Sequence, residues 1–406
     1  ADLLVNCLVL PARMASLFRQ GLSPLPESSR FSQPGGDALD SPAVIASASG
    51  VSMVVESKPL RVSYLNADRS SFVSCLYSPE FLLRLYSFSD DAAPIFNENE
   101  KVPDPFSKLD ELVLDSQPND LVLMCIGGTS DLFAIPMVNG HVLVANASSD
   151  GRRLALFSDL HTHDNAEAMC ACSMETSLVV GGSDGSIVGV DAPTNQKTHI
   201  TKSGSGVDCI VSVGGGSLLA TGHMAGMLSL WDARMSPESG SALTFPRFSI
   251  SPKTLNDGVT ALCVHPAQSN ILVAGRESGS VSFIDVRKGA SMQPETRNAF
   301  EVATGPIRKV AFHPELVDNF FCGSEDGSLI HWDPSHKAST FTSSSLTRVS
   351  PWLSSSLEAS SSLSALISSS GFPSSFAVNF FDFHDRSVLV ACDNHTIRHT
   401  SGLNLV

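Results

Sequence analysis

The sequence predicts an all-β fold, a propeller of seven blades in which small sheets are arranged around one axis. The first observation is a strand, turn and strand written almost in full between Phe321 and Asp333, where an apolar strand enters a Ser-Glu-Asp-Gly turn and a second strand ends in Trp-Asp. The second is that turn glycines of this pattern recur roughly 41 to 53 residues apart. One blade needs about 40 to 45 residues. The period therefore indicates a radial array of repeats.

Four copies of the repeat are strong, and their endings in Trp-Asp or in another apolar-Asp pair indicate WD40 blades. They cover residues 181–191, 221–232, 274–285 and 321–333. Each turn contains a glycine, which adopts positive φ without a Cβ penalty, and two turns contain an aspartate whose carboxylate can accept backbone amide hydrogens. The residues that we assign to the repeat are Asp184, Gly185, Gly226, Trp231, Asp232, Gly279, Asp285, Asp326, Gly327, Trp332 and Asp333.

Three weaker units bring the count to seven. Residues 44–55 have the strand, turn and strand pattern without Trp-Asp, and residues 131–146 pair two apolar strands across Asn139-Gly140, a strong hairpin signal. Residues 388–397 supply the last unit. We expect the first and last units to be adjacent, because ring closure removes the remaining open sheet edge.

The domain organisation follows from composition. Residues 1–40 are rich in proline and contain Gly35-Gly36, so we expect a loop or tail there, with a strand possible at its apolar start. The propeller is assigned to residues 41–406. Within it, residues 57–120 form an acidic, proline-containing insertion in which a packed strand set is not expected. Residues 339–375 contain 17 serines in 37 residues, a composition typical of a mobile insertion, with one anchored turn at Trp352.

Charge and cysteine usage favour protein partners in a reducing compartment. Lys plus Arg is 26 and Asp plus Glu is 41, so the formal net charge of −15 opposes docking onto nucleic acid or an anionic membrane. The nine cysteines do not form a disulfide pattern, since several lie inside apolar strands. The sequence contains no run of about 18 apolar residues, so it predicts no membrane span. Because no methionine starts the chain, we expect that it begins inside a longer reading frame.

No constellation of residues predicts catalysis, a metal or a cofactor. His161-Thr162-His163-Asp164 has two imidazoles and a carboxylate close in sequence. A third ligand at suitable spacing is missing, so a solvated loop is the simpler interpretation than a metal site. His223, His265, His313, His331 and His384 fall at strand or turn positions of the repeat, where structural hydrogen bonds explain them. Motifs of hydrolases and nucleotide-binding loops are absent from the sequence. We therefore predict that the chain is not an enzyme.

The blade signatures and their order resemble a known family. The segment from Ser324 to Asp333, the Ser-rich insertion that follows it, and the segment from Gly226 to Arg234 are similar to the 43-kilodalton WD-repeat nucleoporins of the Y-shaped outer-ring complex. The resemblance implies a non-enzymatic scaffold subunit of the nuclear pore complex at the nuclear envelope, which supports transport of protein and mRNA. It also implies docking to a helical-solenoid nucleoporin of the short arm of the Y, and a kinetochore location in animals.

An alternative function stays open at this point. Trp231-Asp232-Ala233-Arg234, with Ile284-Asp285-Val286-Arg287 as an imperfect copy, resembles the box through which some propellers act as substrate receptors of cullin-type ubiquitin ligases. The structural interpretation is that an arginine after Trp-Asp is common at blade ends, where its guanidinium can stack or pair with the adjoining aspartate. In either case we expect loops to carry the partner contact. The residues that we assign to partner binding are Arg234, Arg247, Arg297 and Trp352.

Overall fold

The computed structural model describes residues 49–403, with gaps at residues 56, 66–69, 79, 89–105, 125–130, 149–150, 175–176, 192–193, 215–217, 233–242, 246–256, 288–298, 318, 333–363 and 366–375. The chain divides into two units, Ala1–Pro42 and Ala43–Val406. All described residues belong to the second unit. The expected tail at residues 1–40, the anchored turn at Trp352 and most of the Ser-rich insertion lie outside the described residues.

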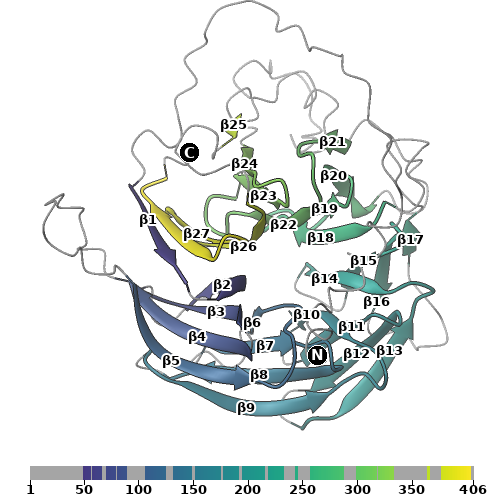
Figure 1. Cartoon of the computed structure of the whole chain (residues 1–406). Helices are drawn as coiled ribbons and strands as arrows, with labels where there is room; N and C mark the ends of the chain where they lie inside the picture. The colour runs from purple at the N-terminus through teal and green to yellow at the C-terminus, as the bar shows by residue number, and fades with distance from the viewer. Residues whose placement is uncertain are drawn as a thin grey trace, which may run out of the picture. The chain divides into compact units, whose positions relative to one another are not determined.

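The described residues form seven antiparallel sheets of four strands each (Figure 1). Blade 1 consists of β2 (Lys58–Tyr64), β3 (Ser71–Ser78), β4 (Glu80–Phe88) and β5 (Phe106–Leu114). Blade 2 consists of β6 (Val122–Met124), β7 (Leu132–Pro136), β8 (His141–Ala147) and β9 (Leu154–His161). Blade 3 consists of β10 (Ala168–Met174), β11 (Ser177–Gly182), β12 (Ser186–Asp191) and β13 (Lys197–Lys202).

The remaining four blades follow the same plan. Blade 4 consists of β14 (Val207–Val213), β15 (Leu218–His223), β16 (Leu228–Asp232) and β17 (Leu243–Phe245). Blade 5 consists of β18 (Val259–Val264), β19 (Ile271–Arg276), β20 (Ser280–Asp285) and β21 (Ala299–Glu301). Blade 6 consists of β22 (Ile307–Phe312), β23 (Phe320–Ser324), β24 (Leu329–Trp332) and β25 (Ser364–Ala365), and blade 7 consists of β26 (Val378–His384), β27 (Ser387–Cys392), β28 (Thr396–Ser401) and β1 (Ser49–Val54).

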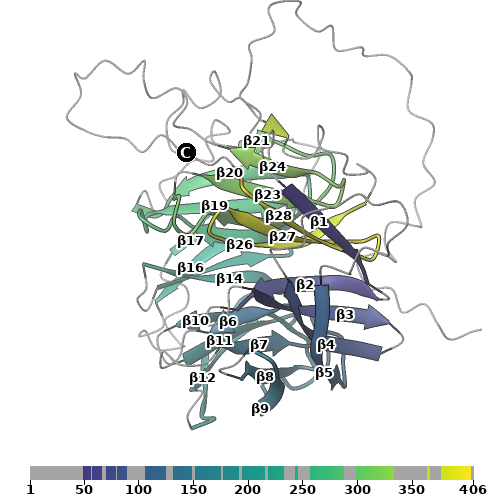
Figure 2. The same cartoon turned by 90° about the vertical axis from the view of Figure 1, so that its left-hand side faces the viewer.

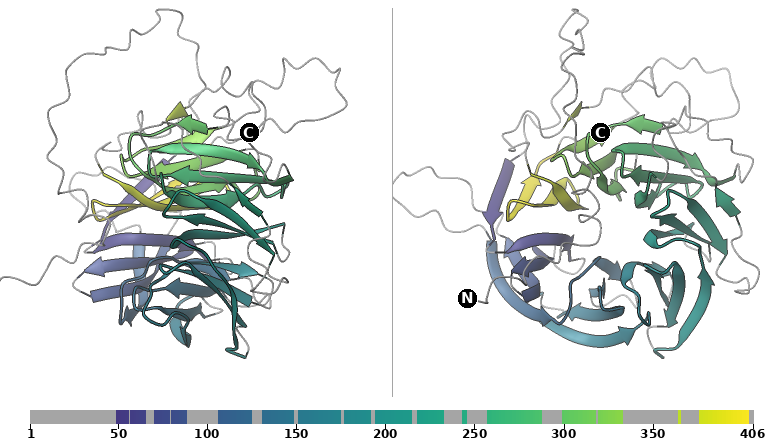
Figure 3. Two further views of the ribbon diagram at one scale, coloured as in Figure 1. Left: turned by 90° about the vertical axis from the view of Figure 1, so that its right-hand side faces the viewer. Right: turned by 45° about the vertical axis from the view of Figure 1, so that its right-hand side comes forward.

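The seven sheets of this unit stand side by side around a central axis (Figure 3), with the first strand of each blade innermost (Figure 1). Seen from the side, the blades stack as tilted sheets (Figure 2). The predicted seven-bladed all-β propeller is therefore confirmed. Blade 7 closes the ring, because β1 pairs with β28 from Ser49↔Ser401 to Val54↔Thr396, and β2 of blade 1 packs against β26 and β27.

Two of the predicted units are corrected by this topology. Residues 44–55 are not a blade: β1 is a single strand that completes blade 7. Conversely, a packed strand set was not expected in the acidic region 57–120, which nevertheless contains the whole of blade 1. The reason is that none of its acidic side chains falls within β2 or β3, and five of the eleven fall between β4 and β5, in residues 89–105. The apolar residues of β3 and β4 are free to pack, and many of them are fully buried.

The hydrophobic core is divided among the seven interfaces between neighbouring blades. Each of seven clusters of buried apolar side chains joins two adjacent blades, including the cluster between blades 7 and 1. Glycines in the second strands permit this packing. A Cβ on Gly222 would lie 2.5 Å from Cγ1 of Val259 in the next blade, and one on Gly275 would lie 2.6 Å from Cγ2 of Ile307. A larger side chain at either glycine would therefore push neighbouring blades apart.

The innermost strands share a structural feature that joins neighbouring blades. Six of them carry a β-bulge near their start, and the carbonyl that precedes a bulge is open to a partner outside the regular ladder. In five blades that carbonyl accepts a hydrogen bond from a side chain of the preceding blade. The bonds are Asn119 Nδ2 to Ala168 O, Cys170 Sγ to Val207 O, Cys209 Sγ to Val259 O, Thr260 Oγ1 to Ile307 O, and Asn379 Nδ2 to Pro59 O.

Two further contacts complete this inner ring. Between blades 1 and 2, Arg61 Nη2 donates to Asn119 O over 2.5 Å. Between blades 6 and 7, the Lys309 ammonium lies 4.1 Å from the centre of the Phe380 ring. Each interface of the ring thus has an apolar cluster and at least one directed contact at its inner end, which together fix the position of every blade.

Candidate functional site: the turn face

The turns between second and third strands lie at one end of the blades, together with the links that enter each blade. Hydrogen bonds join the two sets: the amides of Ser183, Met224, Glu277 and Glu325 donate to the carbonyls of Glu167, Gly206, Gly258 and Pro306. We call these turns and links the turn face. It contains most of the residues that the sequence assigned to the repeat.

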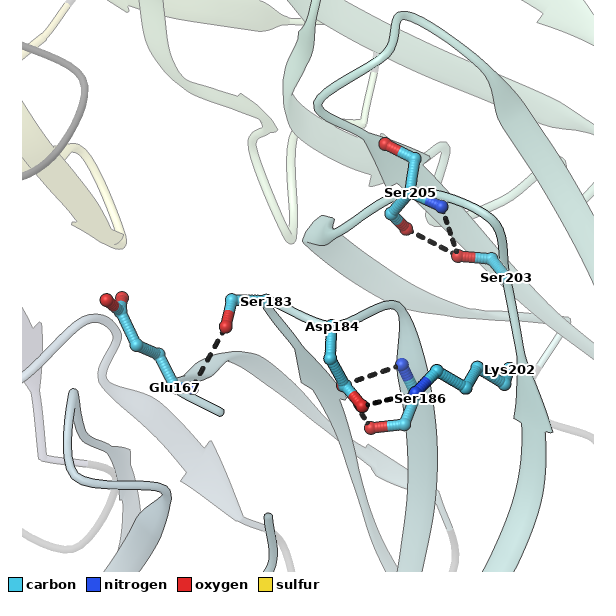
Figure 4. Close-up of polar contacts among 7 residues, drawn as sticks. All are labelled: Glu167, Ser183, Asp184, Ser186, Lys202, Ser203 and Ser205. Carbon is cyan, nitrogen blue, oxygen red and sulfur yellow. Dashed lines mark hydrogen bonds and ion pairs between the residues drawn. The ribbon is translucent and has the colours of Figure 1, made fainter. Parts of the chain in front are cut away.

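The best-defined turn of this face is built around Asp184 (Figure 4). Its carboxylate accepts hydrogen bonds from the amide and hydroxyl of Ser186, at 3.0 and 2.5 Å, and from the Lys202 ammonium at 2.9 Å. Burial would raise the pKa of Asp184, but the bonds from Ser186 and Lys202 outweigh burial and hold that pKa below its usual range. Ser183 Oγ accepts from the Glu167 amide, which joins the turn to the incoming link. Asp184 therefore holds the turn in place.

Asp326 has the corresponding position in blade 6. One carboxylate oxygen accepts from the Ser328 amide at 2.9 Å, and the other accepts from the amide and hydroxyl of Thr304 at 2.7 and 3.0 Å. The turn glycines of the four strong repeats have positive φ, at 85° for Gly185, 81° for Gly226, 83° for Gly279 and 90° for Gly327. At Gly279, a Cβ would also lie 2.2 Å from the carbonyl oxygen of Ala303.

Replacement of Asp326 by alanine should destabilise the fold by about 1 to 3 kcal/mol, because the amides of Thr304 and Ser328 lose their acceptors. Urea denaturation of the variant measures the loss. Asp326→Asn keeps an acceptor oxygen and should recover part of it. An alanine variant as stable as the wild type would show that the carboxylate does not hold the turn.

The last residue of the second strand links the turn face to the core. In blade 4 this residue is His223. Trp231 Nε1 donates to Thr221 Oγ1 over 2.7 Å, the Thr221 hydroxyl lies 2.9 Å from His223 Nε2, and His223 Nδ1 lies 3.2 Å from the Ser205 carbonyl. Since Thr221 accepts from the indole, its own hydrogen points to His223 Nε2, and Nδ1 carries the imidazole proton. A chain of hydrogen bonds thus runs from the core to the link.

Other blades carry different side chains at the last position of the second strand. Arg276 of blade 5 is fully buried and donates from Nη1 to the carbonyl of Asp257, whose carboxylate accepts from Ser278. In blade 3 the position is Gly182, and the imidazole of His163 fills the space, since a Cβ there would lie 2.5 Å from its Cδ2. Sequence analysis missed these equivalences, although alignment of the four strong repeats places Gly182, His223, Arg276 and Ser324 in one column.

Two buried histidines predict acid sensitivity. Burial lowers the pKa of His223 and of His313, and His313 Nδ1 accepts from the amide of Leu316, which requires a neutral ring nitrogen. As the pH drops below about 7, the unfolded chain binds more protons on both residues than the folded chain does, so the free energy of unfolding should fall. Each contributes a slope of up to about 1.4 kcal/mol per pH unit.

Chemical denaturation at several pH values measures this slope. His313→Gln should flatten it, because glutamine does not titrate in this range. A slope that the His313 variant does not alter would contradict the assignment.

Of the remaining residues that the sequence assigned to the repeat or to partner binding, the structure describes some and not others. Asp232 is half-buried at the end of β16. Asp285 is buried and paired with Arg287, whose Nε and Nη2 donate over 2.9 and 2.7 Å; these bonds lower the pKa of Asp285. Trp332 ends β24, but its side chain lies outside the description. Asp333 and all four residues assigned to partner binding, Arg234, Arg247, Arg297 and Trp352, lie outside the described residues.

The candidate metal cluster gains no support from its geometry. His161 is exposed and lies 3.3 Å from Asp164, while His163 is buried and hydrogen-bonded to the Thr162 hydroxyl. Among the described residues, no group of three histidine, cysteine or acidic side chains could hold a metal ion. The described part of the chain also contains no helix with the length and apolar character needed to cross a membrane.

The turn face carries more acidic than basic side chains. Its described basic residues are Lys58, Lys202, Arg276 and Arg308, and each is paired with a carboxylate, those of Asp393, Asp184, Asp257 and Glu325. The other acidic residues of the described turns and links are Glu80, Asp115, Asp120, Asp164, Glu167, Glu277, Glu301 and Asp326. A face of this charge opposes the approach of a phosphate backbone.

The fold and the turn face define a seven-bladed WD-repeat propeller. No protein-family model matches the sequence. The chain is similar to nucleoporin Nup43 of mouse, with 32% identity over 159 residues, which is 34% of this chain and 39% of that protein. It is similar to human Nup43 with 33% identity over 119 residues, 29% of this chain and 28% of that protein. The matches thus span well under half the length of these relatives.

A solved structure supports the fold alone. A chain of the crystal structure of the mitotic checkpoint complex superimposes with a TM-score of 0.60 and 15% identity, covering 92% of this chain and 98% of that chain. At this identity the likeness concerns the arrangement of blades.

Proposed function

We propose that this chain is a non-enzymatic scaffold subunit of the nuclear pore complex, a propeller that holds other nucleoporins. The observation that carries the proposal is the similarity to Nup43 of mouse and human, at 32% and 33% identity over about a third of the chain, in a protein with a WD-repeat propeller fold. Propellers present a large fixed surface of loops and outer strands, which suits a docking role.

The chemistry of the described residues supports a structural role. The polar side chains of the turn face form hydrogen bonds within the turns and to the links between blades, as Asp184 and His223 illustrate. Burial raises the pKa of Cys75, Cys172 and Cys263 to about 12. Since the thiolate is the reactive form, these cysteines behave as small apolar residues of the core.

The finer proposal names the complex and the partner. We place the chain in the Y-shaped outer-ring complex, docked to a helical-solenoid nucleoporin of the short arm and located at the nuclear envelope. There it supports transport of protein and mRNA, with a kinetochore location in animals. The acidic turn face and the net charge of −15 favour protein partners over direct contact with nucleic acid.

The ligase-receptor alternative is less well supported. It requires Trp231 and Arg234 to be available to an adaptor, but the Trp231 side chain is buried and bonded to Thr221. In the second copy of the box, Arg287 pairs with its own Asp285.

A tagged chain tests the proposal in cells of the source organism. We expect the tag to mark the nuclear rim and to recover outer-ring nucleoporins, including a solenoid subunit, from lysate. Diffuse cytoplasmic signal with recovery of a cullin adaptor would contradict the scaffold function and favour the ligase alternative.

A further inference from the structure

The hairpin of β3 and β4 in blade 1 reaches further at the turn face than the hairpins of blades 3–7. In those blades, the residue before the bulge of the first strand pairs with the last residue of the second strand. In blade 1 that partner is Leu76, and β3 continues beyond it. Leu76 in turn pairs with Leu82. We call Tyr77, Glu80 and Phe81 of this extension the blade 1 tip.

Two aromatic rings stack at the blade 1 tip. Tyr77 and Phe81 lie opposite each other in the hairpin, with ring centroids 5.0 Å apart and ring planes at 27°. Phe81 packs against the apolar cluster between blades 1 and 2. Tyr77 is 48% exposed, and its hydroxyl has no hydrogen-bond partner among the described residues. The core thus supports a tyrosine ring that is open to a partner.

Packing of the repeat does not require an aromatic side chain at this place. Tyr77 is the residue that follows Leu76, and in blades 3–7 the corresponding residue follows the last position of the second strand. These residues are Ser183, Met224, Glu277, Glu325 and Asp393. None of the five is aromatic. An exposed tyrosine that the fold does not need is typical of a contact surface, where tyrosine is enriched.

Exposed carboxylates lie beside the aromatic pair. Glu80 precedes Phe81 in β4, and Asp115 follows Leu114, the residue opposite Phe81 in β5. Both side chains are exposed, and neither forms an ion pair with a described residue.

The basic side chains of this region are already paired. Lys58 pairs with Asp393, Arg61 with Asp120 and Arg84 with Glu111. Arg61 also donates to the carbonyls of Leu60 and Asn119. The unpaired charges beside the tip are therefore those of Glu80 and Asp115, and both are negative.

The combination of an open tyrosine ring and unpaired carboxylates fits an arginine side chain. A cation is attracted to the face of an aromatic ring. The guanidinium group is planar, so it can stack on the ring while its N–H groups bond to carboxylates. Lysine carries a compact charge that cannot stack in this way. The negative charge opposes acidic or phosphorylated segments.

We propose that the blade 1 tip docks an arginine side chain from a segment of a partner protein. The guanidinium stacks on Tyr77, and Glu80 and Asp115 supply the negative charge that attracts it. The inference goes beyond the scaffold function and rests on that function only for the identity of the partner, an outer-ring nucleoporin.

Fluorine NMR tests the arginine site directly, because the chain contains three tyrosines and the other two, Tyr64 and Tyr86, are each only 4% exposed. In protein labelled with fluorotyrosine, Tyr77→Phe identifies the Tyr77 resonance. The probe is the acetylated and amidated peptide Gly-Arg-Gly, with Gly-Lys-Gly for comparison. We expect the arginine peptide to shift the Tyr77 resonance and to leave the other two in place, and the lysine peptide to bind about threefold more weakly or less.

Charge variants show whether the carboxylates take part. The double variant Glu80→Gln, Asp115→Asn should weaken binding of the arginine peptide by about threefold or more, as expected for the loss of two exposed ion pairs. Asp164→Asn removes an exposed carboxylate of the turn face outside the tip and should stay within about twofold of the wild type. Thermal melting confirms that each variant is folded.

Calorimetry with the recombinant outer-ring solenoid nucleoporin tests the identity of the partner. Tyr77→Ala should weaken this binding by about tenfold, as expected for an aromatic hot spot. Tyr77→Phe keeps the ring and should stay within about threefold of the wild type. The double carboxylate variant should also make the binding less dependent on salt.

The two readouts separate this inference from the proposed function. A Tyr77 resonance that the arginine peptide does not move, or that the lysine peptide moves equally, would overturn the arginine site and leave the scaffold function standing. A shift with the peptide, together with nucleoporin binding that folded tip variants leave unchanged, would keep the site and remove the nucleoporin as its partner. A shift with the peptide in a chain that binds no outer-ring nucleoporin would keep the site and overturn the scaffold function.

Discussion

A chain that lacks β1 should lose its cooperative folding. β1 supplies the fourth strand of blade 7, with six residue pairs to β28 between Ser49↔Ser401 and Val54↔Thr396. Without it, β28 becomes an open edge, and the ring is held closed by the apolar cluster between blades 7 and 1 and by side-chain bonds such as Asn379 Nδ2 to Pro59 O. If the hydrogen bonds of this ladder contribute about 1 kcal/mol each, the loss is roughly 3 to 6 kcal/mol, against a total stability of about 5 to 15 kcal/mol.

Deletion of residues 1–54 tests this expectation, with urea denaturation and light scattering as the measurements. We expect aggregation or a broad, non-cooperative transition. Deletion of the first unit alone, Ala1–Pro42, keeps β1 and is the matched control. A soluble monomer without β1 that unfolds in one sharp transition would contradict ring closure through this strand.

The place of β1 could not be predicted because its partner is far away in the sequence. The alternation of residues 44–55 indicates extended structure, but the pairing with Thr396–Ser401 joins the two ends of the propeller. A strand without its own hairpin carries no local signal of its partner. The count of seven nevertheless came out correctly, because one false unit at residues 44–55 offset the missed blade 1.

Blade 1 was missed for a related reason. Its turn between β3 and β4 lacks the Asn-Gly or Asp-Gly pair that marks a tight hairpin, and the acidic segment 89–105 dominates the composition of the region. The strong repeats were predictable because their signal is local: a glycine at positive φ, a capping aspartate and two alternating strands lie within about a dozen residues. Contacts such as Gly222 with Val259 join different blades and leave no local pattern.

The candidate sites also include features that a local sequence pattern predicts and features that it does not. The roles of Asp184 and Asp326 in their turns follow from residue type and position. The exposure of Leu109 and Phe157 could not be predicted, because these side chains become exposed only through bulges in strands whose alternation otherwise looks regular. Whether an apolar residue of an outer strand faces the neighbouring blade or the outside depends on register, and the sequence of one strand does not determine that register.

Replacement of Trp231 by alanine should destabilise the fold by about 3 to 5 kcal/mol, because a cavity opens between blades 3 and 4. The indole is only 6% exposed and packs in the cluster that contains Ile187, Ile210 and Leu219. The variant also removes the donor to Thr221, on which the orientation of His223 depends.

Two conservative variants separate packing from hydrogen bonding. Trp231→Phe keeps most of the ring and loses the bond, so it should cost about 1 to 2 kcal/mol. Thr221→Val removes the same bond from the other side, and the double variant should cost less than the sum of the two single variants, since they share one interaction. Urea denaturation measures all four proteins. Because the indole is internal, Trp231→Phe should also leave partner binding unchanged. A folded Trp231→Phe protein that loses its partner would show instead that this tryptophan takes part in docking, as the ligase alternative requires.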